Sequence, residues 1–213
     1  VACAGTQTSD IDGEGSGDQV GALSQTTDVI TLTVGGNDID FKDFATACTV
    51  SLCDFSTQAY QNSHDKILNE LPSKLADTYQ AIDNATSSNT KIYVIGYPYV
   101  LPEEMPTGAN SACFPFNGGV TDPDPTQNNG AAAYAIQAQL NNAIQQAVSD
   151  YNSPKFQYVD PNGSNSPFIG HDWCKQDRYF TQIALNQTSY SYHPNALGHS
   201  AYNTVVRPQI GYW

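Results

Sequence analysis

The chain has 213 residues, of which 39% are hydrophobic and 14% charged, which is typical of a single folded domain with a substantial core. Its 21 acidic and 8 basic residues give a formal net charge of −13, which argues against nucleic acid and anionic membrane surfaces as partners. No run approaches the roughly 20 consecutive apolar residues that span a bilayer, so stable membrane insertion is not expected. We therefore predict one domain over residues 1–213.

The first predicted element is a strand over residues 28–34 (DVITLTV), which ends in the glycine-rich turn GGND. Its nearly continuous apolar and β-branched residues are typical of a strand buried on both faces. From about residue 54 to residue 83, apolar residues recur at steps of three and four, which predicts a helix with one apolar stripe. We expect Pro72 to divide or kink this helix, because proline lacks a backbone donor and clashes with the preceding turn.

Two more strands and two more helices follow along the chain. The strands are predicted at 91–95 (KIYVI) and 155–159 (KFQYV), and the helices at 130–151 and 195–206. Strands that alternate with long helices need crossover connections, which predicts a three-layer α/β/α sandwich with a central parallel sheet. In such folds ligands bind at the carboxyl ends of the strands, where we expect the functional residues.

The composition favours a secreted glycoprotein that acts outside the cell. Five cysteines, a polar surface rich in Ser, Thr, Asn and Gln, and three Asn-x-Ser/Thr sequons support this location. The candidate glycosylation sites are Asn84, Asn162 and Asn186. No leader peptide is recognisable at Val1, so we expect this start to be a product of processing.

Four short motifs are expected to meet at the carboxyl edge of the sheet. They are CAG at 3–5, GGND at 35–38, GYP at 96–98 and YHPN at 192–195. The amide of Asn37 could donate to a developing oxyanion, although asparagine at such a position is also common as a turn or cap residue. His193 could serve as a general base, although a histidine of this kind is more often structural. The other histidines are interpreted as structural or solvated: His64, His171 and His199.

In this order, the motifs resemble the sequence blocks of the SGNH hydrolases, also called GDSL-type esterases and lipases. ACAG at 2–5 resembles the second block of the family, TDVITLTVGGNDIDF at 27–41 the third, and SYHPNALGH at 191–199 the last. The resemblance covers nearly the whole chain. It implies a flavodoxin-like SGNH fold and a carboxylic ester hydrolase that acts by serine acyl transfer.

The resemblance also implies roles for individual residues. The backbone N–H of Gly5 and the side-chain amide of Asn37 would form the oxyanion hole, and His193 would be the base that activates a serine. The carboxylate of Asp38 would support the loop that holds Asn37.

One position departs from the usual pattern of the family, which places an aspartate three residues before the histidine. Here that position is Tyr190, which supplies no carboxylate. Similar members without the aspartate orient the base through a main-chain carbonyl two residues earlier, which here belongs to Ser191. The resemblance therefore implies a Ser–His dyad in which the Ser191 carbonyl accepts from Nδ1 of His193.

The first block of the family, which carries the nucleophilic serine, does not occur in the chain. Ser16 lies in the glycine-rich sequence GEGSG without a preceding strand, so we interpret it as a loop residue. We expect a missing or separate N-terminal segment to supply both the serine and the first strand, so that the domain is N-terminally incomplete and the chain alone inactive. This segment is expected to be a peptide that stays bound after cleavage before Val1.

The alternative is a complete relative without a serine, with a binding role. Loss of a central strand would leave buried backbone groups unpaired, which favours the cleaved enzyme.

The five cysteines leave one residue without a partner in the chain. Cys48 and Cys53 are close enough in sequence to close a small loop, and a bond between Cys113 and Cys174 would join two long irregular segments. Cys3 remains, and the resemblance to disulfide-containing members of the family implies that it bonds to the N-terminal segment.

The expected substrate is an ester, either of a lipid, a small alcohol or an acylated sugar. Several aromatic residues could line its pocket or simply fill the core: Tyr97, Tyr99, Phe114, Phe116, Trp173 and Tyr179. The alternatives are a polysaccharide acetyl esterase and, from another class, a non-catalytic binding protein on the same scaffold. No cofactor or metal is expected, because no His/Cys/Asp cluster has ligand spacing and serine acyl transfer requires neither.

Overall fold

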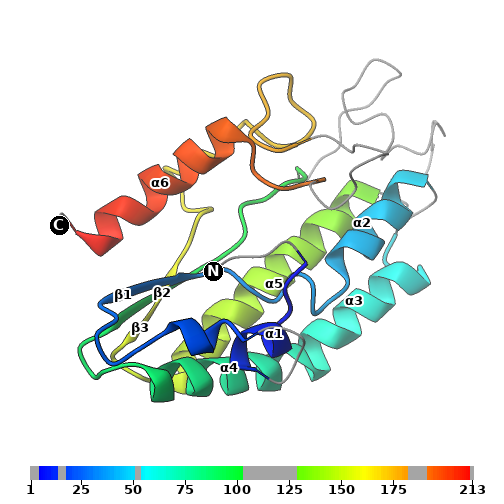
Figure 1. Ribbon diagram of the computed structural model, residues 1–213. Helices are drawn as coiled ribbons and strands as arrows, with labels where there is room; N and C mark the ends of the chain where they lie inside the picture. The colour runs from blue at the N-terminus through cyan, green and yellow to red at the C-terminus, as the bar shows by residue number, and fades with distance from the viewer. Residues whose placement is uncertain (1–4, 14–17, 51–53, 103–128, 182–190, 212–213) are drawn as a thin grey trace.

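The computed structural model of the chain describes residues 5–13, 18–50, 54–102, 129–181 and 191–211. Its centre is a parallel sheet of three strands in the order β1-β2-β3 (Figure 1). The strands are β1 (Val29–Leu32), β2 (Lys91–Ile95) and β3 (Phe156–Val159). Their registers place Ile92 of β2 beside Ile30 of β1 and Phe156 of β3.

Helices connect the strands and cover both faces of the sheet (Figure 1). They are α1 (Thr8–Asp12), the short 3-10 helix η1 (Val20–Ala22), α2 (Phe41–Val50), α3 (Gln58–Asn69), α4 (Leu71–Ala85), α5 (Asn129–Tyr151) and α6 (Ala196–Ile210). Among the helices in these ranges, none has the length and hydropathy needed to cross a membrane.

The side chains of β2 alternate between two apolar layers. Ile92 and Val94 belong to the main core, which also contains the buried residues of α4 and α5. Tyr93 and Ile95 face the opposite way and pack with Val206 of α6. The predicted α/β class, with a parallel sheet flanked by helices, is confirmed.

The predicted helix over residues 54–83 is two helices. α3 ends at Asn69 and α4 begins at Leu71, with Pro72 in the first turn of α4. A proline is tolerated at this place because the first N–H groups of a helix have no intrahelical acceptor. Pro72 therefore marks the start of a helix.

β1 is less buried than its sequence predicts. Thr31 is exposed and the other three residues of the strand are only partly buried. Among the strands that the structure describes, β1 pairs with β2 alone, so its outer edge has no strand beside it. The expected burial on both faces is thus not found within these ranges.

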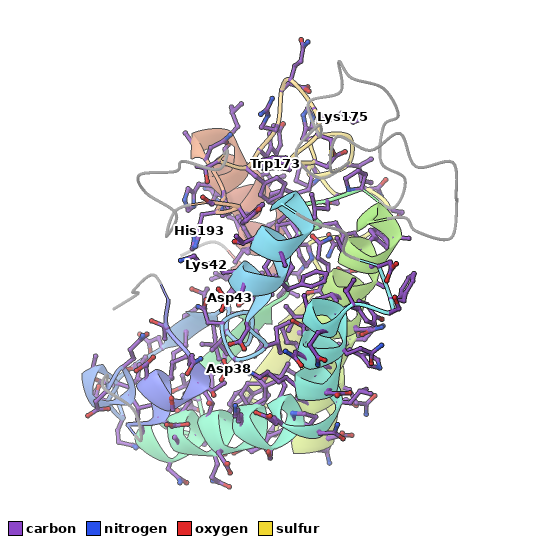
Figure 2. The ribbon with its side chains drawn as sticks, turned by 90° about the vertical axis from the view of Figure 1, so that its right-hand side faces the viewer. Asp38, Lys42, Asp43, Trp173, Lys175 and His193 are labelled. Carbon is purple, nitrogen blue, oxygen red and sulfur yellow. The ribbon has the colours of Figure 1, made fainter. Side chains whose placement is uncertain are left out.

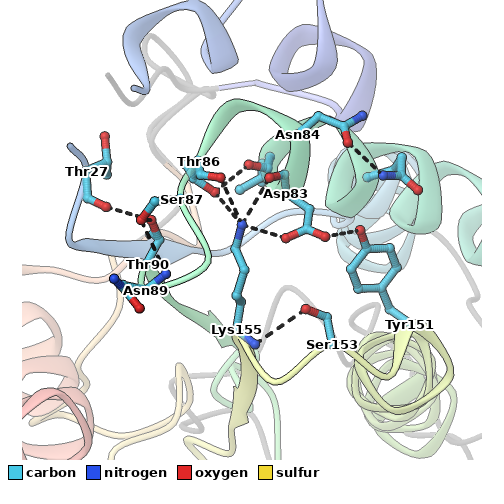
Figure 3. A network of polar contacts seen from close by, with 12 residues as sticks. Thr27, Asp83, Asn84, Thr86, Ser87, Asn89, Thr90, Tyr151, Ser153 and Lys155 are labelled. Atoms are coloured by element: carbon cyan, nitrogen blue, oxygen red, sulfur yellow. Dashed lines mark hydrogen bonds and ion pairs between the residues drawn. The ribbon is translucent and has the colours of Figure 1, made fainter. Parts of the chain in front are cut away.

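Lys155, which directly precedes β3, joins this strand to α4 (Figure 3). It therefore lies at the amino end of the parallel strands, whereas the GGND turn follows the carboxyl end of β1. Its ammonium group forms an ion pair with Asp83 at 2.6 Å and is only 8% exposed. It also donates to the carbonyls of Asp83 (3.0 Å) and Thr86 (3.3 Å) and to the hydroxyl of Thr86 (2.8 Å). A cation at the carboxyl end of a helix satisfies its last carbonyls and interacts favourably with its dipole.

Candidate active site

The GGND turn follows β1 and leads directly into α2. The N–H of Gly36 donates to the hydroxyl of Tyr97, which follows β2, over 3.1 Å. A Cβ atom at Gly36 would lie 3.1 Å from the same hydroxyl oxygen, so the glycine allows this close approach. The Asn37 carbonyl accepts from Asp40, and the Gly36 carbonyl accepts from the first residue of α2, Phe41. These contacts fix the turn at the carboxyl ends of β1 and β2.

The structure places Asn37 beside the segment that contains Gly5. The Asn37 amide donates to the carbonyl of Thr6 over 2.9 Å, and the Gln7 side chain donates to the Asn37 carbonyl over 3.2 Å. Gly5 has a φ of +84°, in the left-handed region that favours glycine. Because an amide nitrogen carries two hydrogens, Asn37 can hold Thr6 and still donate to a second acceptor.

Asp38 is buried and binds Thr8, the first residue of α1. Its carboxylate, 4% exposed, accepts from the Thr8 N–H at 3.3 and 3.1 Å and from the Thr8 hydroxyl at 2.6 Å. The carboxylate thereby joins α1 to the turn that carries Asn37. The expected supporting role of Asp38 at the site stays a prediction.

The backbone of His193 is held by a short antiparallel pairing before α6. The His193 carbonyl accepts from the N–H of Thr181 over 2.8 Å, and Phe180 forms a bridge with Pro194. Asn195 then caps α6, because its side chain accepts from the N–H groups of Leu197 (2.9 Å) and Gly198 (3.0 Å). The histidine is therefore placed by the start of the helix.

Gly198 allows α6 to lie directly against this pairing. A Cβ atom at this position would lie 2.2 Å from the carbonyl oxygen of Tyr179 and 2.8 Å from the Cβ of Pro194. Nothing in the local sequence indicated this contact, because Tyr179 lies 19 residues earlier in the chain.

The imidazole of His193 lies at the surface. Partial burial, together with the nearby His199, lowers its pKa below the usual value, which keeps the ring neutral at neutral pH. A neutral imidazole is the form that a general base requires. Among the residues that the structure describes, no hydrogen bond from the His193 ring is recorded, so its orientation by the Ser191 carbonyl stays a prediction.

The segments that carry Asn37 and His193 meet at the first turn of α2. The ring of Phe41 contacts the ring of Tyr192 edge to face, with centroids 6.5 Å apart and an interplanar angle of 80°. Figure 2 labels His193 and Lys42, which directly follow Tyr192 and Phe41 in the sequence. The YHPN motif thus lies against α2, the helix that follows the GGND motif.

Three side-chain amides hold the loop after β2, two of them buried and the third, that of Asn162, partly buried. Asn141 of α5 accepts from the N–H of Tyr97 over 2.7 Å and donates to its carbonyl over 2.8 Å. Asn162, which follows β3, donates to the same carbonyl and accepts from the N–H of Tyr99, each over 2.9 Å. Gln137, one turn before Asn141, likewise accepts from the N–H of Val100 over 2.7 Å. The loop is thereby tied to α5 and to the end of β3.

The three candidate glycosylation sites differ in accessibility. Asn84 is exposed on α4. The amide nitrogen of Asn162, to which a glycan would be attached, is bonded to the carbonyl of Tyr97. Asn186 lies outside the described ranges. Of the two sites that the structure describes, Asn84 is the exposed one and Asn162 is partly buried.

A cavity of about 140 Å³ opens beside this loop, with a mainly aromatic and aliphatic wall. Its lining includes Tyr99, Leu101, Tyr134, Phe168 and Ile169. The rings of Tyr99 and Tyr134 lie 4.6 Å apart, and Ile169 is 61% exposed.

Three other aromatic residues that the sequence offered as pocket candidates are absent from the part of the cavity wall that the structure describes. Trp173 is 3% exposed within the core. Tyr97 and Tyr179 are half-buried and contribute to the core. Phe114 and Phe116 lie outside the described ranges.

The cysteine pairings stay predictions. Cys174 takes part in a disulfide, but Cys113, its expected partner, lies outside the residues described. The same holds for Cys3 and Cys53 and for the side chain of Cys48. In the part of the chain that the structure describes, no group of three or more His, Cys, Asp or Glu side chains could hold a metal ion.

The fold defines an α/β protein whose polar turns gather at the carboxyl ends of parallel strands, the usual ligand-binding edge of this class. The model of the GDSL-like lipase/acylhydrolase family matches residues 1–201, and the chain belongs to this family. The predicted family is thus confirmed.

Related proteins come from Streptomyces. Lipase 1 of Streptomyces coelicolor is 27% identical over 202 residues, which cover 94% of this chain and 65% of the relative. The lipase of Streptomyces rimosus is 26% identical over 202 residues, with the same coverage of 94% and 65%. The chain therefore spans about 65% of the length of these relatives.

Two solved structures share the fold. The extracellular lipase of Streptomyces rimosus has a TM-score of 0.71 and 25% identity, with 96% of this chain and 77% of that chain covered. Phospholipase A1 of Streptomyces albidoflavus NA297 has a TM-score of 0.75 and 25% identity, with 97% and 77% covered.

Proposed function

We propose that the protein is a carboxylic ester hydrolase of the esterase or lipase type, with His193 as general base and with Gly5 and Asn37 as oxyanion donors. The observation that carries this proposal is the meeting of three distant segments at one end of the sheet. Asn37 bonds to Thr6, and the helix that follows Asn37 contacts the residue before His193. Membership of the GDSL-like family supports the same chemistry.

The chemistry is acyl transfer in two halves. A serine hydroxyl attacks the ester carbonyl carbon while Nε2 of His193 accepts its proton, and the resulting oxyanion is stabilised by the Gly5 N–H and the Asn37 amide. Collapse of the tetrahedral intermediate expels the alkoxide, which takes the proton from the imidazolium and leaves as the alcohol. Water then attacks the acyl carbon while His193 accepts its proton, and collapse releases the acid as the imidazolium returns a proton to the serine oxygen. The Ser191 carbonyl would hold the imidazole through Nδ1–H.

The nucleophilic serine is proposed to lie on an N-terminal segment outside these 213 residues, linked through Cys3. The segment would add a strand to the outer edge of β1 and so complete a single SGNH domain. Among the described strands none pairs with the outer edge of β1, and the apolar residues of β1 are partly exposed, which supports this arrangement because paired strands bury such residues. Without the segment, the chain is expected to be inactive.

The proposed substrate is an acyl ester with an apolar acid part, such as a lipid or a small ester. The cavity of about 140 Å³ beside Tyr99 has a mainly apolar wall. A cavity of about 150 Å³ can hold a benzene molecule, so this one has room for the last carbons of a short acyl chain. The relatives described as lipases and as a phospholipase A1 favour lipid esters, and the extracellular lipase favours action outside the cell.

A fluorophosphonate probe combined with mass measurement tests the proposal. The protein as isolated should be labelled once, and reduction should release a labelled peptide of a few kilodaltons from the 213-residue chain. His193→Ala should abolish labelling and the hydrolysis of p-nitrophenyl esters, while the matched control His199→Ala should keep both. A protein that neither reacts with the probe nor hydrolyses esters would instead be a binding protein on this scaffold. Activity restricted to acetylated polysaccharide would identify the acetyl esterase.

A further inference from the structure

The backbone at Tyr192 adopts a conformation that is unusual for a bulky residue. Three non-glycine residues have a positive φ in the described ranges, namely Asp40, Asn152 and Tyr192, which has a φ of +68°. Aspartate and asparagine tolerate the left-handed region, whereas a residue with a large ring rarely adopts it. Such conformations persist where the surrounding structure holds them, and they cluster at functional sites.

This conformation determines which side chain of the segment reaches the surface. Ser191 and Tyr192 are each 8% exposed, and His193 is exposed. A regular extended segment would turn successive side chains to opposite sides, so two buried neighbours followed by an exposed one require a local turn. The turn lies within the antiparallel pairing, where the N–H of Tyr192 donates to the carbonyl of Thr181 over 3.3 Å.

Contacts on two sides hold the ring of Tyr192. It meets Phe41 of α2 edge to face at 6.5 Å and the indole of Trp173 at 6.0 Å. Trp173 is itself fixed, since its indole N–H donates to the carbonyl of Thr181 over 3.1 Å and its backbone N–H to that of Val100 over 2.7 Å. The ring therefore links the segment before α6 to the helix that follows Asn37.

We propose that Tyr192 is a positioning residue that sets the imidazole of His193 against the turn that carries Asn37. The ring ties the segment to α2, and the left-handed backbone directs the next side chain outward toward the proposed oxyanion donors. This inference rests on the proposed function, because it concerns His193 as the base. If Tyr192 only filled the core, its substitution would change the stability of the fold and leave kcat and the pKa of His193 unchanged.

The test compares Tyr192→Ala with Tyr192→Phe and with a matched control, Tyr151→Ala. Tyr151 also contacts two aromatic rings, those of Tyr79 and Phe156, but at the carboxyl end of α5. The measurements are kcat and KM for p-nitrophenyl acetate and the NMR titration of the His193 ring, all on the protein as isolated.

Tyr192→Ala should lower kcat by about 10- to 100-fold, the cost of a misplaced catalytic group, and change KM by less than about threefold. It should also move the His193 titration to higher pH, because loss of the ring admits water and burial is the main cause of the lowered pKa. Tyr192→Phe keeps the ring and should restore both quantities. Tyr151→Ala should change neither.

Wild-type kcat and titration in folded Tyr192→Ala, or the same changes in Tyr151→Ala, would overturn the inference. If Tyr192→Ala does not fold, Tyr192→Leu keeps most of the buried volume and is judged by the same two quantities. The NMR titration of the His193 ring distinguishes a failure of this inference from a failure of the proposed function. A wild-type protein without esterase activity whose His193 titration still depends on Tyr192 would refute the enzyme and support the positioning role.

Discussion

At the scale of single residues, the surroundings of His193 combine exposure with a partial loss of hydration. The ring lies at the surface, while burial of part of it and the neighbouring His199 both lower its pKa. Both causes disfavour the imidazolium, the protonated form of the ring, which cannot accept a further proton as a base must. If His193 is the base, as proposed, the lowered pKa should extend the pH range of activity toward acid.

The contribution of His199 can be measured directly. In the wild type, kcat/KM should fall as the pH falls through the pKa of His193, because the protonated ring cannot act as a base. His199→Gln removes a charge that disfavours the imidazolium, so the pKa rises and the fall in kcat/KM begins at a higher pH. The pH profile of p-nitrophenyl acetate hydrolysis measures this shift. His64→Gln, a change on α3, should leave the profile where it is, and an unmoved profile in His199→Gln would contradict the prediction.

At the scale of elements, α6 depends on a position where its first turn touches other backbone. Gly198→Ala would place a methyl group 2.2 Å from the carbonyl oxygen of Tyr179, so the helix must shift. Overpacking of this kind costs about 2 kcal/mol of unfolding free energy, which urea denaturation can measure. Gly163→Ala is the matched control, because a Cβ atom there meets nothing within 4 Å. Equal stability of the two variants would show that α6 adapts freely.

The connection between α4 and β3 provides a second prediction at this scale. Lys155→Met would leave Asp83 and the last carbonyls of α4 without their cation. Removal of one partner from a buried ion pair destabilises by about 3 kcal/mol. The exposed pair of Lys74 and Glu70 serves as the comparison, since Lys74→Met should cost only about 0.4 kcal/mol. Thermal or urea unfolding measures both, and kcat should stay unchanged because Lys155 lies far along the sheet from the GGND turn.

At the scale of the whole molecule, the net charge of −13 should govern the choice of lipid surface. Vesicles of phosphatidylglycerol carry negative charge and repel the protein, so fatty acid release should be several-fold slower than from phosphatidylcholine at low salt. At about 1 M salt the Debye length falls to about 3 Å, and the difference should largely disappear. Equal rates at low salt, or a difference that persists at high salt, would contradict the prediction that electrostatic repulsion sets the relative rates of fatty acid release.

The strands could be predicted because their signals are local, whereas the roles of the candidate site residues stay predictions. The apolar runs at 91–95 and 155–159 coincide with β2 and β3 to within a residue, because a short apolar run bounded by loop residues is typical of a strand in a parallel sheet. α1 was not predicted, because five residues are too few to show a helical period. α2 follows the GGND turn and was not predicted, although Phe41, Phe44, Ala45 and Cys48 recur along it at helical steps of three and four.

What could not be predicted depends on contacts between distant residues. The sequence indicated His193 but not the left-handed turn at Tyr192, which is held by rings 151 and 19 residues away, at Phe41 and Trp173. The sequence likewise did not indicate the hydrogen bonds from the loop after β2 to Asn141 and Asn162. The exposure of β1 differed from expectation because burial depends on what lies beside a strand, which its own residues do not specify.

The hydrogen bonds of Asn162 also bear on how the protein can be manufactured. A yeast or mammalian host that attaches a sugar to Asn162 during synthesis would do so before the nitrogen reaches the carbonyl of Tyr97. A sugar on this partly buried nitrogen would replace one of its two hydrogens and crowd the loop after β2 as it closes against β3. Production in bacteria, or in a eukaryotic host after Ser164→Ala has removed this acceptor sequence, avoids the conflict while leaving the Asn162 amide intact.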